Sequence, residues 1–333
     1  MQSNNKKMKV LGVGNALVDI MVRIPDDSLL DTLKLPKGSM QLVDKQKSDE
    51  IIQGISSVET RITSGGSAAN TINGLASMKV GTGFIGTLGK DEMGSKFISD
   101  FQKNQVVPHI SYSETHSGKA VVFVSPDGQR TFATYLGAAI EMGPDQMSAD
   151  IFSNYNIVHI EGYLLQNYDL IEAAMKRALS QKVRTSLDLA SFNVVEDHKD
   201  FLLQLIPNNI DILFANEDEA RALTGLEPEE AVLAMGEMVP LAIVKTGAKG
   251  SLIYDRKTVT SVEAIPSECI DTTGAGDLYA AGFLYGMIQG KELSKCGAFG
   301  SVLAGNVIGV VGAKIHDHHW GNLLDSFHVE EIK

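Results

Sequence analysis

Short apolar runs that alternate with segments of helical periodicity dominate the second half of the chain. Four such runs lie at 157–160, 185–189, 210–215 and 241–245, and helices are predicted between them at 170–181, 218–224 and 229–238. Strands that alternate regularly with helices form βαβ units around a mostly parallel sheet. This half of the chain therefore predicts an α/β fold.

The first 150 residues follow a less regular pattern. Strands are predicted at 10–13, 38–43 and 84–85, and helices at 68–79 and 92–104. Segments 119–124 and 131–135 flank the sequence Ser-Pro-Asp-Gly-Gln at 125–129, which is typical of a hairpin turn. A second hairpin is predicted from segments 251–254 and 258–262. Because the first hairpin and the region after residue 16 do not fit the alternation, they predict a small β-sheet lid, approximately 16–45 and 112–136, within one domain spanning 1–333.

Composition narrows the class of protein. The 333 residues are 44% hydrophobic and 21% charged, the balance of a soluble globular enzyme. A net charge of −12 argues against a nucleic-acid or anionic membrane partner, which would attract a basic surface. Two cysteines without C-x-x-C spacing indicate a reducing, cytoplasmic environment without disulfides or a zinc site. The apolar stretch 10–22 is interrupted by Asp19, and the stretch 298–313 is too short to span a bilayer. Both are therefore interpreted as buried core.

The strongest candidate for chemistry is the sequence Asp271-Thr-Thr-Gly-Ala-Gly-Asp277, which precedes an apolar segment at 278–288. Glycines directly before a helix present backbone N–H groups at its positive end, where anions bind. Phosphoryl transfer needs such donors together with a carboxylate that orients or deprotonates the attacking hydroxyl, and Asp277 is placed for that role. The alternative is a glycine turn followed by a helix-capping aspartate, and the motif alone favours neither.

Two further segments suit a polar substrate. Gly65-Gly66 opens a predicted helix with Asn70 one turn inside it, which allows close backbone approach to a hydroxyl or forms an ordinary turn. Asn15 and Asp19 follow the first strand, and ligands of α/β sheets bind at the carboxyl ends of strands. Asp19 interrupts an apolar run, so it lies either in a cleft, where it would accept from a hydroxyl, or at an exposed bend.

Other motifs carry less information. Asn216 and Glu219 follow a predicted strand, where a carboxylate would bind Mg²⁺ through water or simply cap a helix. Glycines 81, 83 and 86 match G-x-G-x-x-G but fall in a predicted strand, the wrong context for dinucleotide binding. Histidines 316, 318 and 319 are more typical of a polar turn than of a metal site. Arg130 at the hairpin is a solvated cation or, beside a lid, a contact to phosphate or substrate.

The order of these motifs over nearly the whole chain resembles the ribokinase, or phosphofructokinase-B (pfkB), family of carbohydrate and nucleoside kinases. Gly14-Asn15 with Asp19 comes first, then Gly65-Gly66 with Asn70, then Asn216 with Glu219, and last the 271–277 sequence. The last is highly specific when it follows the glycine pair. The resemblance implies a ribokinase-like three-layer α/β/α sandwich with a β-sheet lid, and a monomer or homodimer that phosphorylates a small-molecule sugar or nucleoside with ATP and Mg²⁺.

The resemblance also assigns roles by position. Asp277 would be the base, and the anion hole for the γ-phosphate would be Gly274, Ala275 and Gly276. The residues on the acceptor side would be Asn15, Asp19, Met40, Gly65, Gly66, Asn70 and the lid residue Arg130. The residues on the ATP side would be Asn216, Thr246, Gly247, Gly250 and Thr273. Glu219 would hold Mg²⁺ through water, and Asp271 with Thr273 matches positions that bind potassium in many members.

The acceptor is left open between two classes. The four-residue step from Asn15 to Asp19 and the sequence Gln129-Arg130-Thr131 resemble adenosine kinases, which slightly favours a nucleoside. Met40 stands where adenosine kinases tend to carry a base-contacting glutamine, a departure that keeps a sugar or sugar phosphate of the ribose or fructose type open as the acceptor. A non-catalytic sensor of nucleotides or sugars is a third hypothesis, although a pure binder needs no base. A nicotinamide-dependent oxidoreductase would rest only on the misplaced glycine motif.

Overall fold

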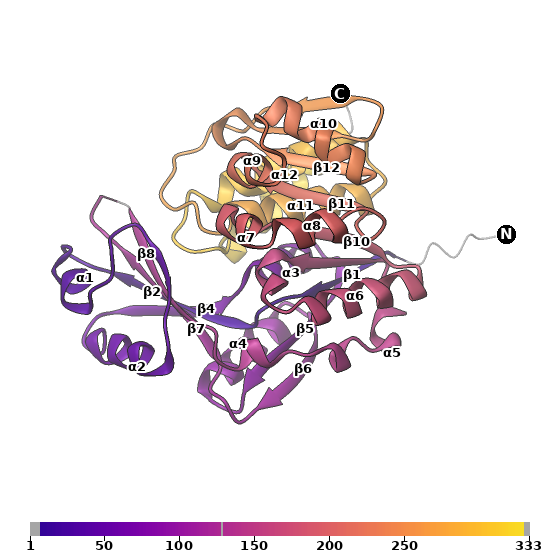
Figure 1. Cartoon of the computed structure of the whole chain (residues 1–333). Helices are drawn as coiled ribbons and strands as arrows, with labels where there is room; N and C mark the ends of the chain where they lie inside the picture. Colours follow the sequence, from indigo (N-terminus) through magenta and orange to yellow (C-terminus); the bar gives the residue numbers. More distant parts are fainter. Residues whose placement is uncertain (1–6, 128, 330–333) are drawn as a thin grey trace.

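Two β-sheets organise the molecule, and the chain crosses between them several times (Figure 1). The computed structural model describes residues 7–127 and 129–329; Gly128, part of the predicted hairpin turn, lies outside them. The larger sheet has nine strands and the smaller has five. The smaller sheet projects beside the larger one at the left of Figure 1.

The large sheet is parallel except at one edge. Its strands in spatial order are β14 (Val259–Val262), β13 (Ser251–Tyr254), β12 (Leu241–Lys245), β11 (Ile212–Asn216), β10 (Arg184–Asp188), β9 (Ile157–Glu161), β1 (Lys9–Val13), β5 (Gly81–Gly89) and β6 (Val107–Ser113). Only the pairs β12–β13 and β13–β14 are antiparallel, and the second of them is the predicted hairpin. The predicted α/β class and mostly parallel sheet are confirmed.

Helices cover both faces of this sheet. One face packs against α3 (Ser67–Ser77), α4 (Glu92–Lys103), α11 (Ala275–Ile288), α12 (Leu293–Val307) and α13 (Trp320–Val329). The other packs against α5 (Ala149–Phe152), α6 (Tyr168–Gln181), α7 (Phe192–Asp197), α8 (Lys199–Leu205), α9 (Glu217–Thr224) and α10 (Pro228–Met238). Successive strand residues serve opposite faces, since Ile212 and Phe214 enter one core and Leu213 the other. Three layers result because most residues of the central strands are apolar and buried, so both faces of the sheet must be covered.

The smaller sheet has the order β3 (Met40–Leu42), β8 (Arg130–Tyr135), β7 (Gly118–Val124), β2 (Leu17–Arg23) and β4 (Thr60–Gly65). Helices α1 (Ser28–Leu33) and α2 (Lys45–Gly54) pack on one face, over Ile20, Val22 and Phe123. The predicted segments 16–45 and 112–136 omit α2 and β4, and their residues 112 and 113 belong to β6 of the large sheet. Strand β4 escaped prediction because it begins with the polar, exposed pair Thr60 and Arg61.

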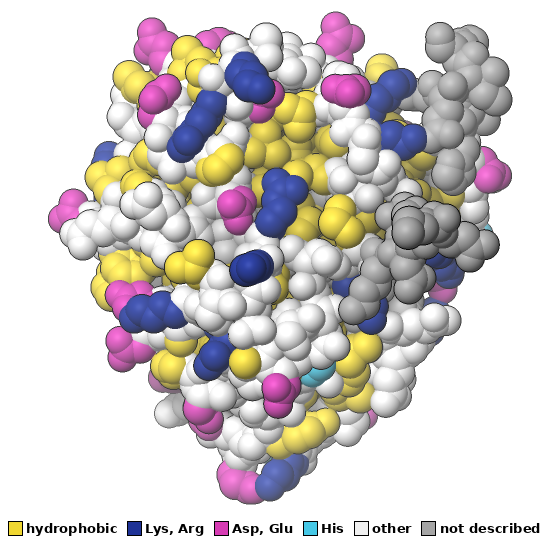
Figure 2. Space-filling view, turned by 90° about the vertical axis from the view of Figure 1, so that its right-hand side faces the viewer, with side chains coloured by type: hydrophobic (Ala, Val, Ile, Leu, Met, Phe, Trp, Pro, Cys, Tyr) yellow, Lys and Arg dark blue, Asp and Glu magenta, His cyan; other side chains and the backbone are white. Residues whose placement is uncertain are grey.

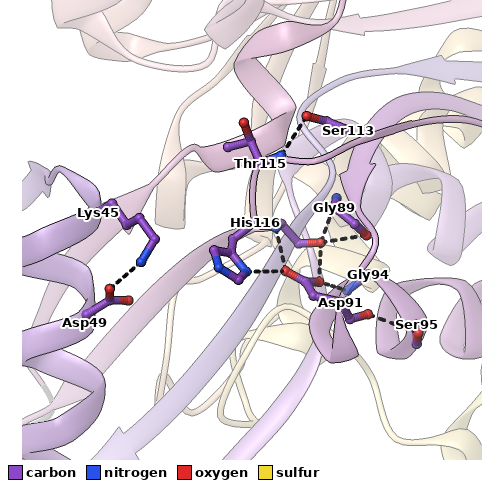
Figure 3. A network of polar contacts seen from close by, with 10 residues as sticks. Lys45, Asp49, Gly89, Asp91, Gly94, Ser95, Ser113, Thr115 and His116 are labelled. Carbon is purple, nitrogen blue, oxygen red and sulfur yellow. Dashed lines mark hydrogen bonds and ion pairs between the residues drawn. The ribbon is translucent and has the colours of Figure 1, made fainter.

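The apolar run 10–22 contains two strands that belong to different sheets. Strand β1 ends at Val13 and β2 begins at Leu17, and Asn15 lies in the short connection. A second crossing joins β5 and α4 to β7, where Asp91 accepts hydrogen bonds from Ser117 N (2.8 Å) and Ser117 Oγ (2.7 Å). Figure 3 shows Asp91 between His116 and the start of α4, with Gly89 beside it. This network fixes the point where the small sheet leaves the large one.

The three glycines of the G-x-G-x-x-G match lie inside strand β5, and two of them, Gly83 and Gly86, are needed there for packing. A Cβ on Gly83 would lie 1.9 Å from Tyr155 Oη, and one on Gly86 would lie 2.7 Å from the Phe84 ring. Neither glycine opens a helix. The match therefore reflects close packing on a buried strand.

Charged side chains of both signs occur on the surface of the molecule. On the face in Figure 2, Lys and Arg side chains are interspersed with Asp and Glu, and no continuous basic patch is visible there outside the grey atoms. No helix within 7–127 and 129–329 combines the length and apolarity needed to cross a membrane. The run 298–313 contributes the buried residues Phe299, Leu303 and Val307 to the core.

Replacing Gly83 with alanine is expected to lower the free energy of unfolding by about 1–3 kcal/mol, because the added methyl overpacks the contact with Tyr155. Gly81→Ala is the matched control, since its Cβ would meet only the exposed side chain of Lys9, at 3.1 Å. Urea unfolding monitored by circular dichroism measures both. Equal midpoints and slopes for the two variants would contradict the packing role of Gly83.

Candidate active site

Polar and charged side chains end four neighbouring strands of the large sheet. Strands β9, β10, β11 and β12 end at Glu161, Asp188, Asn216 and Lys245, and the register pairs Asp188 with Glu161 and Asn216 with Lys245. Because these strands are parallel, the four residues lie along one edge of the sheet, where ligands of α/β folds bind. The edge therefore locates the candidate site.

Asp277 reaches this edge from the first turn of α11. The helix begins after Gly274, whose φ of 75° and close contact to Ala313, 2.6 Å from a built Cβ, require glycine. Asp277 Oδ1 accepts a hydrogen bond from Ser67 Oγ (2.7 Å), and Oδ2 accepts one from Asn70 Nδ2 (2.9 Å). The N terminus of α3 thus orients the carboxylate.

The electrostatic surroundings of Asp277 leave it as a weak base near neutral pH. Burial raises its pKa to about 6, against the hydrogen bonds from Asn70 and Ser67, which lower it. The charge of Asp188 adds to the increase and that of Lys245 opposes it. A general base works best when its pKa lies close to the working pH, so this value suits proton removal from a hydroxyl.

Lys245 supplies positive charge to the same place. Its Nζ donates to Asp188 Oδ2 at 2.7 Å, and a Cβ on Gly276 would lie only 3.1 Å from it. Burial alone would lower the pKa of Lys245, but the charges of Asp188 and Glu219 outweigh it and raise the pKa. The ammonium therefore stays protonated beside the glycines at the start of α11. A helix N terminus with an adjacent cation is suited to an anion.

Asn216 and Glu219 form a reciprocal capping box at the start of α9. Asn216 Oδ1 accepts from Glu219 N (2.9 Å), and Asn216 N donates to Glu219 Oε2 (2.7 Å). Burial raises the pKa of Glu219 to about 7, and Lys245 opposes that increase. Capping accounts for the sequence pattern, but it also holds a 2% exposed carboxylate beside Lys245. The capping interpretation is therefore confirmed, and the Mg²⁺ interpretation of Glu219 stays a prediction.

The glycine pair allows backbone and carboxylate to approach closely. A Cβ on Gly65 would lie 2.2 Å from the Asp19 carboxylate, and one on Gly66, at φ 100°, would lie 2.2 Å from Asn15 O. The predicted acceptor-side residues Asn15, Asp19, Gly65, Gly66 and Asn70 are therefore brought together. Burial raises the pKa of Asp19 to about 7, and the charge of Lys314 lowers it.

Glu161 organises the acceptor side, and sequence analysis missed it. Its Oε1 accepts from Asn15 N (2.9 Å) and Asn15 Nδ2 (2.8 Å), and its Oε2 accepts from Ala68 N (2.8 Å). Burial raises the pKa of Glu161 to about 7 against these hydrogen bonds. The carboxylate joins the loop after β1 to the start of α3. It thereby holds Asn15 beside the first turn of α3, the helix that carries Asn70.

The loop predicted for potassium is occupied by a cation from the protein. Arg130 Nη1 donates to Asp271 Oδ1 and to Thr273 Oγ1, and Arg130 Nη2 donates to Thr272 Oγ1. Asp271 also accepts from Thr273 N (2.7 Å) and from Gly312 N (2.8 Å). Since a guanidinium and two amides already use these acceptors, the side chains of Asp271 and Thr273 do not fit a potassium ion. Arg130 meets the catalytic loop rather than open solvent.

The predicted nucleotide loop follows strand β12. Thr246 lies directly after Lys245, and its N–H donates to Gly250 O at 2.8 Å across the short turn 247–249. Gly250 is required by its φ of 99° and by a contact to Val262 O, 1.9 Å from a built Cβ. Thr246 follows the strand that pairs with β11, whose last residue is Asn216, so the predicted residues Asn216, Thr246, Gly247 and Gly250 lie near one another, whereas Thr273 contacts Arg130.

Two predicted features lie apart from this cluster. Met40 is 49% exposed on the edge strand β3 of the small sheet. The rings of His316, His318 and His319 contact one another just before α13, with His316 stacked on His318 and the centroids of His318 and His319 4.1 Å apart. No group of three or more metal-binding side chains suited to an ion occurs among residues 7–127 and 129–329.

The residues that sequence analysis missed are Ser67, Glu161, Asp188, Lys245 and Lys314. For three of them a signal existed, because a charged residue that ends an apolar strand is expected at a ligand site. Glu161, Asp188 and Lys245 each follow such a run. Ser67 and Lys314 carry no local signal.

Taken together, a hydrogen-bonded carboxylate, a helix N terminus and a buried lysine surround one point. The carboxylate can remove a proton from a hydroxyl, and the helix end with Lys245 can stabilise negative charge that develops on a phosphoryl group. Such a set suits phosphoryl transfer.

Comparisons with known proteins agree with this chemistry. The model of the pfkB family carbohydrate kinases matches residues 39–319. The adenosine kinase of Sinorhizobium meliloti is 32% identical, with a TM-score of 0.86 over 97% of this chain and 99% of that one. A probable sugar kinase from Rhizobium etli is 31% identical, with a TM-score of 0.88 over 98% and 99% of the two chains.

A curated relative is similar over almost the same extent. The adenosine kinase of Saccharomyces cerevisiae is 26% identical over 328 residues, which cover 90% of this chain and 94% of the yeast protein. The family match covers most of the chain, and the site contains the groups that phosphoryl transfer to a hydroxyl requires. The chain therefore belongs to the pfkB family of carbohydrate kinases and is a sugar or nucleoside kinase.

Proposed function

We propose that the protein transfers the γ-phosphoryl group of ATP to a hydroxymethyl group of a ribonucleoside or sugar, with Asp277 as the base. The observation that carries this proposal is the arrangement of Asp277, which receives hydrogen bonds from Ser67 and Asn70 and has a pKa of about 6. A carboxylate so held can accept the proton of a hydroxyl that binds between Asp19 and the start of α11.

The proposed step balances without a further reactant. Asp277 takes the hydroxyl proton, the oxygen forms a bond to the γ-phosphorus, and the bond from that phosphorus to the bridging oxygen breaks, which releases ADP. The N terminus of α11 and the ammonium of Lys245 stabilise the charge on the transferred group. Gly274, Ala275 and Gly276 let the phosphoryl group approach the backbone.

The charges near Lys245 suit a divalent cation. The carboxylates of Asp188, Glu219 and Asp277 surround one lysine, so negative charge is in excess there. Kinases of this family use ATP with Mg²⁺, which neutralises phosphate charge when it is bound. Glu219, fixed by Asn216, would hold it through water, because magnesium keeps much of its hydration.

A nucleoside is the favoured acceptor. Burial raises the pKa of Tyr163, and the charge of Asp277 adds to the increase, so this partly exposed ring lies near the catalytic carboxylate. An aromatic ring beside the site can stack on a nucleobase. The similarity to adenosine kinases supports the same choice. A sugar acceptor is the second candidate, supported by Met40 and by the similarity to a probable sugar kinase.

An ADP-release assay over adenosine, inosine, ribose, fructose and fructose phosphates tests the proposal. We expect turnover with adenosine above that with the sugars. Asp277→Asn should lower kcat on the best acceptor by about 10²-fold or more, because the base is lost, while ATP still binds. Ser95→Ala, on the exposed side of α4, is a control that should leave kcat unchanged. Wild-type kcat in Asp277→Asn would refute the assigned role, and turnover with the sugars alone would replace the nucleoside.

The pH dependence should follow the ionisation of Asp277. Since the base must be deprotonated, kcat/KM is expected to fall as the pH drops through about 6. Asn70→Ala removes a hydrogen bond that lowers the pKa of Asp277, so this limb should move to higher pH. Asn154→Ala, at the opposite end of the sheet, serves as the control. An unmoved limb in Asn70→Ala would show that another group controls it.

Arg130 supplies to Asp271 the positive charge that a bound monovalent cation would otherwise supply. We expect equal turnover in potassium and tetramethylammonium salts of the same ionic strength, because Arg130 already balances Asp271. Arg130→Gln leaves a 1% exposed carboxylate unpaired, which should cost about 3–5 kcal/mol in unfolding free energy and make turnover depend on potassium. Arg23→Gln, exposed on β2, is the control. Strong activation of the wild-type protein by potassium would contradict this prediction.

A further inference from the structure

A second polar cavity lies behind the catalytic helix start, on the side of α3 that faces α4. Its volume is about 250 Å³, and its walls come from β4, α3, α4 and the segment 313–320. Asn15, Asp19, Gly66 and Asp277 do not line it. Asn70 and Lys314 connect the cavity to the site described above, because both line the cavity, Asn70 donates to Asp277 and the charge of Lys314 acts on Asp19.

Cationic side chains dominate the walls of this cavity. Arg61, Lys96, Lys103 and Lys314 line it, against the two acids Asp100 and Asp317. This local excess of positive charge occurs in a chain with a net charge of −12. Such an excess in one concave site attracts an anion from solution.

The pairing of these charges leaves one cation without an acid. Asp100 forms ion pairs with Lys96 (2.7 Å) and Lys314 (3.5 Å), and Asp317 forms one with Lys103 (2.7 Å). No ion pair or hydrogen bond of the Arg61 side chain is found within residues 7–127 and 129–329. Arg61 nevertheless lines the cavity, and its charge adds to burial in lowering the pKa of His316, another lining residue.

Two buried amides supply a second, independent indication of a ligand. Asn70 is 5% and Asn73 is 4% exposed, and both line the cavity. Asn70 Oδ1 and Asn73 Nδ2 have no hydrogen-bond partner among the described residues, although Asn73 Oδ1 accepts from Asn104 Nδ2 at 3.0 Å. A buried polar atom without a partner costs about 1–3 kcal/mol, so an occupant that pairs with these atoms would be stabilised.

We propose that this cavity is an anion site that binds the phosphate group of a small phosphomonoester or inorganic phosphate. Arg61 and Lys103 would meet the charge, Asn73 Nδ2 would donate to a phosphate oxygen, and Asn70 Oδ1 would accept from a hydroxyl. Guanidinium and ammonium groups with amide donors are the usual partners of phosphate. A volume of about 250 Å³ holds such a group with a few carbons but is below the usual range for a nucleotide-sized ligand.

The fluorescence of Trp320 can report whether the cavity is occupied. This residue is the single tryptophan of the chain, lines this cavity and is 9% exposed. Its fluorescence can therefore follow binding in the full-length protein, whether or not the protein transfers phosphate. Inorganic phosphate, ribose 5-phosphate and uncharged ribose are titrated at constant ionic strength, with the α11 anion hole filled by a non-hydrolysable ATP analogue and Mg²⁺.

We expect a saturable change in Trp320 emission with one or both phosphates and none with ribose. The phosphate that binds more tightly identifies the source of the anion. Arg61→Gln and Lys103→Gln should each weaken binding about tenfold, the loss of one charge-assisted hydrogen bond. Lys257→Gln, an exposed lysine on the β13–β14 hairpin, is the charge-matched control and should bind as the wild type does.

Asn73→Asp is the decisive variant, because it keeps the size of the side chain and the hydrogen bond from Asn104 but places a carboxylate in the cavity. Binding should be lost while the circular dichroism spectrum is kept. Saturable emission changes of equal affinity in Arg61→Gln, Lys103→Gln and Asn73→Asp would overturn the proposal. So would the absence of any change with either phosphate in the wild-type protein.

Discussion

The buried ammonium of Lys245 is the charge on which the rest of the site depends. It lies 2.7 Å from Asp188, beside Glu219 and close to Gly276, and burial would favour its neutral form if those carboxylates were absent. The dependence is mutual, because Lys245 lowers the pKa values of Glu219 and Asp277, which burial raises. The pKa values of Glu219 and Asp277 therefore stay close to neutral pH. A base, or a carboxylate that holds a phosphate-bound cation, would need to ionise in that range.

The sheet makes this arrangement rigid. Glu161, Asp188, Asn216 and Lys245 end four adjacent parallel strands whose other residues, except Arg184, are buried. Their positions follow from the register of the sheet, and helices α3 and α11 then bring Asn70 and Asp277 to the same edge. Glycines occur where atoms must approach more closely than a Cβ permits, as at Gly65 beside the Asp19 carboxylate.

The small sheet is joined to this edge by polar contacts. Arg130 of β8 donates to Asp271 and Thr273 immediately before α11, so the position of the small sheet and the shape of the catalytic loop are coupled. At the other end of the small sheet, Ser117 donates two hydrogen bonds to Asp91 and so holds the segment that enters β7 against the start of α4. Movement of the small sheet against the large one would thus break a nearly buried ion pair and expose Asp271.

The sequence by itself determined the α/β class, the parallel sheet, most of its strands and the position of Asp277 at the start of a helix. Apolar periodicity and glycine-rich turns are local signals, so they can be found in the sequence alone. It also determined that Asn15, Asp19, Gly65, Gly66 and Asn70 belong together, through the order of motifs. Only the tertiary structure decided that Glu161 joins Asn15 to α3 and that Lys245 meets the start of α11. It also decided that Arg130 takes the acceptors predicted for potassium and that Arg61 and Lys103 share a cavity with Asn73. These contacts join residues far apart in the chain, so no local pattern encodes them; the packing of helices on the sheet does.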